Sequence, residues 1–368
     1  MPAIQVRLAG RSYDVLVEAG ALEARLEAFV RDRLPSGAAA LLSDANVDPL
    51  YGEAAFRGLS SAGLSVRRLR IEAGEASKSP AVVARLWEEM LSAGLDRGSS
   101  LVALGGGVVG DVGGFASATY MRGLPFLMIP TSLLAQVDSS VGGKTGVNHA
   151  GAKNLVGVFA QPAGVLIDPS TLGTLPRREF VSGLAEAVKE AVILDAAFFD
   201  RLEAEADAIL ALEPEALERM IRRSVEIKAS VVEADEREVT GKRALLNLGH
   251  TVGHALESSS GPGVWRHGEA VAAGMVAEAR LAERFRGFPP AETARLSALL
   301  ETLGLPVGLP ADADPGTLLK AMGADKKALS GRLRFVLPER IGRAVLVDDV
   351  RPDAVLEVLR ALRASPGA

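Results

Sequence analysis

Three of the four histidines in this chain lie close together, at positions 250, 254 and 267. One helical turn separates His250 from His254, so on a helix both imidazoles lie on one face. His267 and Glu269 stand at a predicted helix start, and Glu186 offers a carboxylate from an apolar segment. Two histidines and one glutamate that leave one position open are a common way of holding catalytic Zn²⁺. A histidine on an apolar face is more often a core residue, and spacing alone does not choose three ligands among these five side chains.

A glycine-rich segment, Gly105-Gly-Gly-Val-Val-Gly-Asp111, contains the pattern G-x-G-x-x-G between a predicted strand and a predicted helix. Free N–H groups at such a helix N-terminus suit a diphosphate. The acid that usually binds the ribose, about 20 residues further on, is missing near Pro130. Asp111, placed in the first helical turn, would repel a phosphate but could cap the helix or accept hydrogen bonds from ribose hydroxyls. A bound dinucleotide and a plain glycine turn both remain open interpretations.

The segment 136–154 combines glycines, amides and small residues with two cations, Lys144 and Lys153. Backbone N–H groups and ammonium groups together suit an anion. Gly-Lys-Thr at 143–145 is similar to the end of an ATP-binding P-loop, but Asp138 stands where that motif needs glycine, which excludes it. A flexible surface loop is the alternative interpretation.

Further cations are scattered through the second half of the chain, at Lys189, Lys228, Arg243, Lys326 and Lys327. Each one alone is typical of a solvated surface. Lys228 differs because it lies in the apolar run Ile-Lys-Ala-Ser-Val-Val, which favours a side chain that points inward.

These residues must be positioned by a regular framework, and the first 170 residues alternate apolar strands with helices. Such alternation predicts a mostly parallel α/β sheet, with ligands at the carboxyl ends of its strands. Polar residues follow several strands, at Asp44, Glu75, Asp111, Thr131 and Asp168. We expect a hairpin over 4–8 and 13–17, strands at 38–42, 65–71, 101–104, 124–129 and 165–167, and helices such as 82–93.

From about residue 176 the pattern becomes helical, so we expect two domains, 1–175 and 176–368. One late strand pair is predicted at 333–337 and 344–347. The predicted helices of the second domain are 180–194, 216–234, 246–258, 269–284, 291–303 and 352–363.

The composition is that of a globular protein, with 48% hydrophobic and 24% charged residues. The net charge of −5 and the lack of a basic block argue against a nucleic-acid partner. No apolar run is long enough to span a membrane. The absence of cysteine excludes disulfides and thiolate metal sites and fits a reducing compartment, so we expect a cytoplasmic protein.

Taken together and in order, these motifs resemble the 3-dehydroquinate synthase family of sugar phosphate cyclases. The resemblance covers nearly the whole chain. It runs through the segments 105–111, 120–123, 130–144, 153–154, 175–186, 228–238, 247–257, 267–271 and 325–327.

The resemblance implies an α/β N-terminal Rossmann-like NAD-binding domain with a mostly parallel sheet, and a mainly α-helical C-terminal domain that binds metal and substrate. It implies Zn²⁺ or Co²⁺ held by Glu186, His250 and His267, with His254 facing the substrate. The implied NAD contacts are Asp44, Glu75, Lys78, Gly106, Gly107, Val108, Val109, Gly110, Asp111, Thr131, Ser132, Lys144, Lys153, Thr171, Leu172 and Thr174.

The substrate implied by the resemblance is a sugar-acid phosphate, 3-deoxy-D-arabino-heptulosonate 7-phosphate. Transient oxidation by NAD⁺, β-elimination of phosphate, re-reduction, ring opening and aldol closure would give 3-dehydroquinate, the second step of the shikimate pathway. Arg122 would reach the site of a neighbouring subunit, which implies a homodimer. The implied substrate positions are Arg122, Asp138, Lys144, Asn154, Lys189, Lys228, Arg243, Asn247, His254 and Lys326, and catalysis is assigned to Lys144, Lys189, Arg243, Asn247 and His254.

Three alternatives stand beside this interpretation. Another cyclase, such as a valiolone synthase or a deoxy-inosose synthase, would share the NAD turn and the metal triad but differ in its carboxylate-binding cations. A metal-dependent polyol dehydrogenase, such as glycerol dehydrogenase, would consume NAD. A non-catalytic NAD-sensing or assembly protein would not need a complete set of anion-binding residues.

Overall fold

The computed structural model of the chain describes residues 3–261, 263–324 and 333–363. The chain divides into two compact units, Met1–Leu175 with Leu217–Arg237, and Pro176–Ala216 with Glu238–Ala368. The sequence predicts a continuous second domain from 176 to 368, whereas the structure groups residues 217–237 of that stretch with the first unit. Among the described residues, no helix is long and apolar enough to cross a bilayer.

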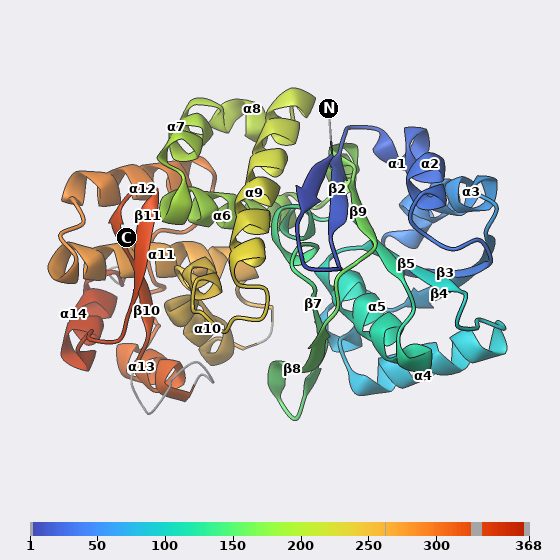
Figure 1. The fold of residues 1–368 in the computed structure, drawn as a ribbon. Coiled ribbons are helices and arrows are strands. Elements are labelled where there is room, and N and C mark those ends of the chain that lie inside the picture. Colours follow the sequence, from blue (N-terminus) through green and yellow to red (C-terminus); the bar gives the residue numbers. More distant parts are fainter. Residues whose placement is uncertain (1–2, 262, 325–332, 364–368) are drawn as a thin grey trace. The chain divides into compact units, whose positions relative to one another are not determined.

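A seven-stranded sheet forms the centre of the first unit (Figure 1). Its order is β1-β2-β9-β6-β5-β3-β4, and only the β1–β2 pair is antiparallel. The predicted hairpin and mostly parallel sheet are therefore confirmed. The strands are β1 (Ile4–Val6), β2 (Tyr13–Val17), β3 (Ala38–Asp44), β4 (Ser65–Ile71), β5 (Ser100–Gly105), β6 (Phe126–Pro130) and β9 (Gly164–Ile167).

Helices cover both faces of this sheet because its central strands are apolar on both sides. On one face, Leu41 and Val102 belong to an apolar cluster with residues of the helices α1, α2 and α3. On the other face, a Cβ at Gly113 would lie 3.1 Å from atoms of Leu42 and Ala103, so α5 approaches closely there. These helices are α1 (Ala21–Ala24), α2 (Leu26–Arg31), α3 (Glu53–Ser61) and α5 (Gly107–Thr119), and α4 (Pro80–Ser92) contacts α5.

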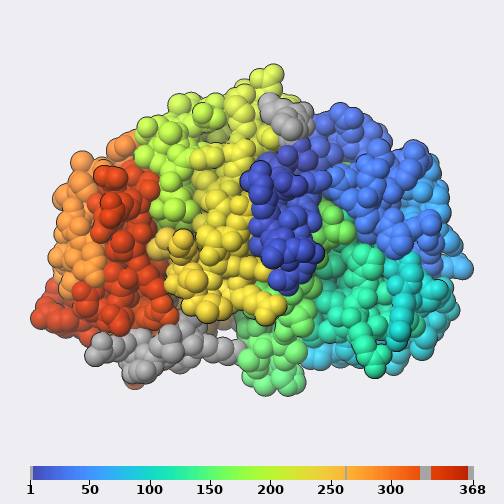
Figure 2. Space-filling model, viewed as in Figure 1, coloured from blue at the N-terminus to red at the C-terminus, as the bar shows by residue number. Residues whose placement is uncertain are grey.

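A separate two-stranded ribbon, β7 (Lys144–His149) with β8 (Ala152–Phe159), extends from the first unit (Figures 1 and 2, green). The middle of β7, residues 145–147, is buried and the strand contacts α5, whereas β8 is exposed along almost its whole length. The loop interpretation of this segment is thus wrong beyond residue 143. The sequence hides the strands because Gly146 and Gly157 pair across the ribbon, where a Cβ at Gly157 would lie 2.3 Å from the Thr145 carbonyl oxygen.

Helices dominate the described part of the second unit, together with an antiparallel strand pair, β10 (Phe335–Arg340) and β11 (Arg343–Val347), as predicted. The helices within this unit are α6 (Arg177–Leu194), α7 (Ala196–Ala204), α8 (Ala206–Leu210), α10 (His250–Ser259), α11 (His267–Phe285), α12 (Pro290–Thr302), α13 (Pro315–Ala324) and α14 (Pro352–Ala361). The remaining long helix, α9 (Pro214–Ala234), begins in this unit and continues into the first.

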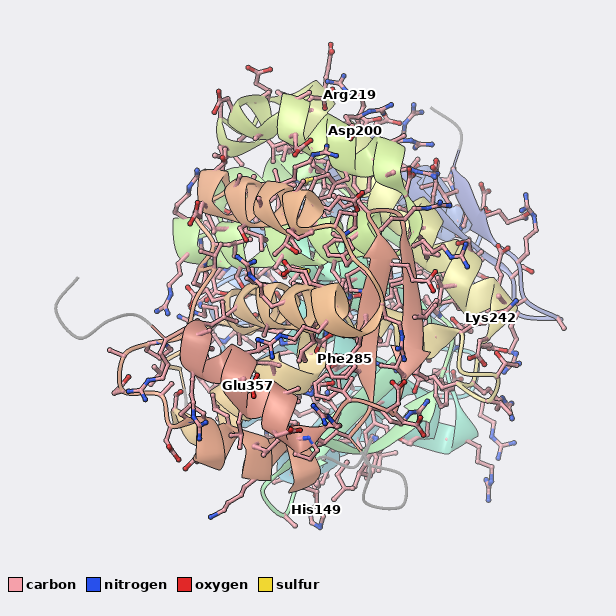
Figure 3. All side chains as sticks on the ribbon, turned by 90° about the vertical axis from the view of Figure 1, so that its left-hand side faces the viewer. His149, Asp200, Arg219, Lys242, Phe285 and Glu357 are labelled. Carbon is pink, nitrogen blue, oxygen red and sulfur yellow. The ribbon has the colours of Figure 1, made fainter. Side chains whose placement is uncertain are left out.

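Charged side chains lie on the outside of the second unit, among them Asp200 and Glu357 (Figure 3). Asp200 pairs with Arg295 at 2.8 Å, and Glu357 pairs with Arg284 at 2.7 Å. Exposed pairs of this kind contribute about 0–1 kcal/mol each. The unit is therefore held together mainly by its buried apolar helix faces, of which α11 contributes one of the longest.

One predicted helix, 246–258, is two elements in the structure. A 3₁₀ turn over Arg243–Asn247 ends before Gly249, whose φ of 78° is left-handed, and α10 begins at His250. The apolar spacing continues across the break, so the sequence pattern does not reveal it. The break matters because it makes His250 the first residue of a helix.

Candidate functional site

Three helices of the second unit bring Glu186, His250 and His267 together. Glu186 lies in the middle of α6, and the two histidines are the first residues of α10 and α11. Potential ligand atoms of the three residues all lie within 4.8 Å of one another. Of the five candidate ligands suggested by spacing, the structure thus groups the three that the resemblance implies.

The distances within this cluster suit one tetrahedral metal ion. Glu186 Oε1 lies 3.4 Å from His267 Nε2 and 3.8 Å from His250 Nε2. Ligand atoms on one tetrahedral Zn²⁺ lie about 3.4 Å apart when each bond is about 2.1 Å. Glu186 Oε1 is also fully buried and lacks a hydrogen-bond partner among the described residues. A cation between the three atoms would satisfy it.

Both imidazoles are oriented by a hydrogen bond on their other nitrogen. His250 Nδ1 lies 3.1 Å from the Leu248 carbonyl oxygen, and His267 Nδ1 lies 3.4 Å from Glu257 Oε2. Each ring therefore turns its Nε2 toward Glu186. An acceptor on one ring nitrogen is the usual support for a histidine that binds metal through the other.

Charge is balanced tightly around Glu186. Burial raises its pKa, but the Lys189 ammonium, together with His267 and His250, outweighs burial and holds the pKa well below its usual value. Lys189 is itself buried and bonds to Glu186 Oε2, so the two carboxylate oxygens have separate partners. Glu186 is thus anionic at neutral pH.

The pKa values of the two histidines shift in opposite directions. Burial, with the nearby charges of Lys189 and His267, lowers the pKa of His250 well below 6.5, although Glu186 opposes this. Burial also lowers the pKa of His267, but the nearby carboxylates of Glu186 and Glu257 outweigh burial and raise that pKa to about 9. In the metal-free protein His250 is therefore neutral, whereas His267 is cationic at neutral pH, with a proton on both ring nitrogens. A metal that binds to His267 Nε2 would have to displace one of these protons.

The other two candidates of the spacing argument are engaged differently. The His254 ring lies 5.3 Å from that of His250, on the same face of α10. Glu269 pairs with Arg178 at 2.6 Å and accepts the backbone N–H of Arg266. Because these contacts occupy both of its oxygens, Glu269 supports the start of α11.

Two further predicted substrate residues lie in the second unit. Arg243 is buried, with its Nε 3.8 Å from Glu238 Oε1. Asn247, half-buried, donates its side-chain amide to the Ala244 carbonyl. Lys326 and Lys327 lie outside the described residues.

In the first unit, the glycine turn lies where a parallel sheet binds ligands. β5 is flanked by β3 and β6, and the chain order reverses between β3 and β5, because β4 lies on the far side of β3. Such a switch point leaves a crevice at the carboxyl ends of the strands. Asp44 ends β3, and Gly105 ends β5 one residue before the N-cap of α5. This is the setting in which a dinucleotide binds.

Backbone approach around this turn is close. A Cβ at Gly106 would lie 3.3 Å from Ser132 Oγ, and one at Gly107 would lie 3.1 Å from Ser139 Oγ. The N-cap, Gly106, offers no side chain to the first N–H groups of α5, which leaves them available to an anion. The remaining residues of the turn, Val108, Val109 and Gly110, form the first turn of the helix.

Asp111 differs from expectation, since it is not in the first helical turn and caps nothing. It lies one turn further on, and its Oδ2 accepts a 2.5 Å hydrogen bond from Lys78. Burial raises its pKa, with Glu75 acting in the same direction, while Lys78 and Lys228 oppose the rise. Lys78 and Asp111 therefore form an ion pair beside the glycine turn.

Some of the other predicted NAD residues make hydrogen bonds, and some of them are buried. Asp44 accepts the N–H groups of Asn46 and Val47 at 2.8 and 2.9 Å. Thr131 is buried, and its N–H bonds to Gly105. The structure buries Thr171 and Leu172, and Thr174 Oγ1 lies 2.7 Å from the Tyr51 hydroxyl.

Lys228 points inward, as its apolar neighbours suggest. It is buried on α9, and its ammonium bonds to Asp138 Oδ1 at 2.5 Å and to the Asp138 backbone carbonyl. The structure thus pairs two predicted substrate residues that are 90 positions apart. By contrast, Arg122, Lys144, Lys153 and Asn154 are exposed.

Three residues that received no role have contacts in these sites. Glu257 meets His267, Glu278 accepts the Gly249 N–H at 2.8 Å, and Asn148 bridges Glu75 and Asn154. Glu257 follows His250 by two helical turns, so a shared helix face was the available signal. Glu278 stands among alanines and valines of α11, where a buried acid is unusual. Asn148 carries no comparable signal.

Comparison with known proteins identifies the family. Two family models match adjoining parts of the chain, the 3-dehydroquinate synthase N-terminal model over residues 68–182 and the C-terminal model over 183–328. The chain belongs to the 3-dehydroquinate synthase family. It is 50% identical to the 3-dehydroquinate synthase of Symbiobacterium thermophilum, over 97% of this chain and 100% of that one. It is 46% identical to that of Desulforamulus reducens, over 98% and 99%.

Solved structures agree with this family assignment. The 2-epi-5-epi-valiolone synthase of Streptomyces hygroscopicus, with NAD⁺ and Zn²⁺ bound, has a TM-score of 0.88 at 31% identity, over 97% of this chain and 98% of that one. A 2-deoxy-scyllo-inosose synthase complexed with carbaglucose-6-phosphate, NAD⁺ and Co²⁺ has a TM-score of 0.87 at 28% identity, over 98% and 99%. A glycerol dehydrogenase from Schizosaccharomyces pombe, at 16% identity, shares only the fold.

Proposed function

We propose that this chain converts 3-deoxy-D-arabino-heptulosonate 7-phosphate to 3-dehydroquinate and phosphate. The cluster of Glu186, His250 and His267 carries the proposal, in a chain that is 46–50% identical to two named 3-dehydroquinate synthases along 99–100% of their lengths. The other cyclases, at 28–31% identity, are more distant relatives.

The second unit would supply the metal site. Glu186 Oε1 and the Nε2 atoms of His250 and His267 are the ligands, and Zn²⁺ or Co²⁺ supplies Lewis acidity toward a substrate hydroxyl when bound. Glu186 stays anionic because Lys189 neutralises its far oxygen. His254, on the same helix face as His250, is placed to exchange a proton with the substrate.

The first unit would bind NAD⁺ at the β3–β5 switch point. The N–H groups at Gly106 and Gly107 face the diphosphate, and Asp44 lies at the neighbouring strand end. NAD⁺ supplies a transient oxidant that the reaction regenerates. Lys78 and Asp111 line this region as a neutral pair, which keeps an uncompensated carboxylate away from a phosphate.

The substrate carries a carboxylate and a phosphate, together about −2.5 to −3 near pH 7. The chain itself has a net charge of −5, so it must hold this anion with locally placed cations. We assign that role to Lys144, Lys189, Lys228, Arg243 and Arg122, with Asp138, Asn154 and Asn247 as hydrogen-bonding partners.

We further propose a cytoplasmic homodimer. Leu155, Val156, Val158 and Phe159 of β8 are 37–44% exposed, along a strand that, within the described part of the chain, pairs in a sheet only with β7. An exposed strand edge that is apolar over most of its length and lacks proline is a site where another strand can pair. A second copy of β8 fits, because antiparallel pairing about a two-fold axis at the centre of the strand would place Lys153 of one copy opposite Val158 of the other.

Phosphate release from the heptulosonate phosphate tests the proposed reaction, with native protein, NAD⁺ and Zn²⁺ or Co²⁺. We expect catalytic phosphate release that a chelator abolishes, with no accumulation of NADH. Steady NADH formation would instead indicate a dehydrogenase. Turnover of glucose 6-phosphate in place of the heptulosonate phosphate would indicate another cyclase.

A further inference from the structure

Glu257 approaches the metal cluster from outside. It lies on α10, seven residues after His250, and its side chain is only 13% exposed. Its Oε2 is 3.4 Å from His267 Nδ1, and the opposite nitrogen of the same ring is 3.4 Å from Glu186 Oε1. His267 is therefore held between two carboxylates, one on each ring nitrogen.

Two roles for Glu257 are compatible with this geometry. His254, Glu257 and His267 form a second group whose potential ligand atoms lie within 4.8 Å of one another, so they could hold a second metal ion. A neutral imidazole, however, has one lone pair and one N–H. If Nε2 binds a metal beside Glu186, the proton stays on Nδ1, where Glu257 can only accept it. Two metals on His267 would require the loss of both ring protons.

The two ring nitrogens of His250 also have different partners. Its Nδ1 faces the Leu248 carbonyl at 3.1 Å, while its Nε2 faces Glu186. Both histidines thus have an acceptor behind them and Glu186 in front, although a backbone carbonyl serves one and a carboxylate the other.

We propose that Glu257 is a positioning residue, which accepts the Nδ1–H of His267 and so fixes the tautomer and ring orientation that present Nε2 to the metal. This inference rests on the proposed metal site at Glu186, His250 and His267. Partners of this kind typically change metal affinity by about 10–100-fold. A carboxylate acceptor also makes the imidazole more basic, so that its other nitrogen binds a metal more strongly. A backbone carbonyl has a weaker effect of the same kind.

The test measures metal affinity by competition with a chelator, for Zn²⁺ and Co²⁺, on the full chain. We expect Glu257→Ala to weaken binding by about 10–100-fold and to change the visible spectrum of the Co²⁺ form. Glu257→Gln should lie between, because its amide oxygen still accepts the hydrogen bond. Glu301→Ala, which removes an exposed carboxylate of α12, is the matched control and should bind like the native chain.

A second measurement reads the tautomer directly. The chain has four histidines, so ¹⁵N NMR of the Zn²⁺ form resolves each ring. We expect His267 to be protonated on Nδ1 in the native protein and to lose this single tautomer in Glu257→Ala. The thermal midpoint of the metal-free variant, if unchanged, excludes a general loss of fold.

The outcomes separate this inference from the function on which it rests. Native metal affinity in a folded Glu257→Ala would overturn the positioning role alone. Two bound Zn²⁺ ions per native chain, one of them lost in Glu257→Ala, would replace it with a second metal site. A native chain that binds no metal would contradict the proposed function itself.

Discussion

At the scale of single residues, the two carboxylate oxygens of Glu186 have different partners, which places this residue at the centre of the proposed metal site. Oε2 meets Lys189, and Oε1 faces the two imidazoles. The carboxylate, two imidazoles and one ammonium are all carried by α6 and two helix starts. Each side chain therefore depends on backbone that packing already fixes.

The first prediction separates ligands from neighbours. His250→Ala and Glu186→Ala should lose the metal and all activity, because each removes an atom from a three-atom site. His254→Ala should retain stoichiometric metal and lose activity, since its ring lies beside the cluster. Elemental analysis of the purified variants decides this. Full metal content in His250→Ala, or none in His254→Ala, would reverse the assignment.

A pH dependence follows from the proton on His267. The pKa of this histidine is raised to about 9 in the metal-free protein, so below that pH a metal must displace a proton to bind. Apparent metal affinity should therefore rise with pH up to about 9 and then level off. Calorimetry in buffers of different ionisation enthalpy should detect proton release near pH 7.5. Binding without proton release at that pH would contradict the raised pKa.

At the scale of elements, the break at Gly249 determines where His250, the first residue of α10, lies. Its left-handed backbone turns the chain sharply, and its N–H is held by the buried Glu278 of α11. There is no space for a side chain at this position, since a Cβ would lie 2.5 Å from the Val271 carbonyl oxygen. Glycine is thus required here both by conformation and by contact.

The third prediction tests that requirement. Gly249→Ala should destabilise the second unit by more than the roughly 1–2 kcal/mol that a left-handed alanine costs, because of the added clash with α11. Gly287→Ala is the matched control, since Gly287 also has positive φ but open space around it. Urea unfolding of the two variants measures the difference. Equal losses would show that the clash is relieved cheaply.

The elements also show which parts of the structure could be predicted from the sequence. The strands, the glycine turn and the histidine cluster were predictable, because apolar runs, glycines and rare histidines leave local signals. The β7–β8 ribbon was not, since Gly146 and Gly157 interrupt its pattern. Nor could spacing reveal that Lys228 pairs with Asp138, because that contact depends on tertiary packing between α9 and a distant turn.

At the scale of the whole molecule, association through β8 is open to direct test. Val156→Arg places a charge in the middle of the apolar edge, so we expect the native dimer to become a monomer, as measured by analytical ultracentrifugation. Leu91→Arg is the control, because Leu91 is 64% exposed and belongs to α4 and not to the β7–β8 ribbon. A Val156→Arg protein that remains dimeric would place the interface elsewhere.

Subunit mixing tests whether Arg122 acts across the dimer. Arg122→Ala and His254→Ala should each be inactive, and mixed dimers should contain one site with both native residues. Random exchange would then restore about a quarter of native activity, because half of the dimers are mixed and each has one complete site. No recovery in verified mixed dimers would show that Arg122 serves its own subunit.

The path of the chain through α9 limits how this gene can be recombined. The two family models meet between residues 182 and 183, yet the stretch Leu217–Arg237 belongs to the first unit. A chimaera joined at that seam with a homologue would therefore combine Asp138 from one parent with Lys228 from the other. Such a chimaera keeps the pair only if both parents have these residues at positions 138 and 228. The segment that carries α9 should therefore be exchanged together with the N-terminal half of the chain.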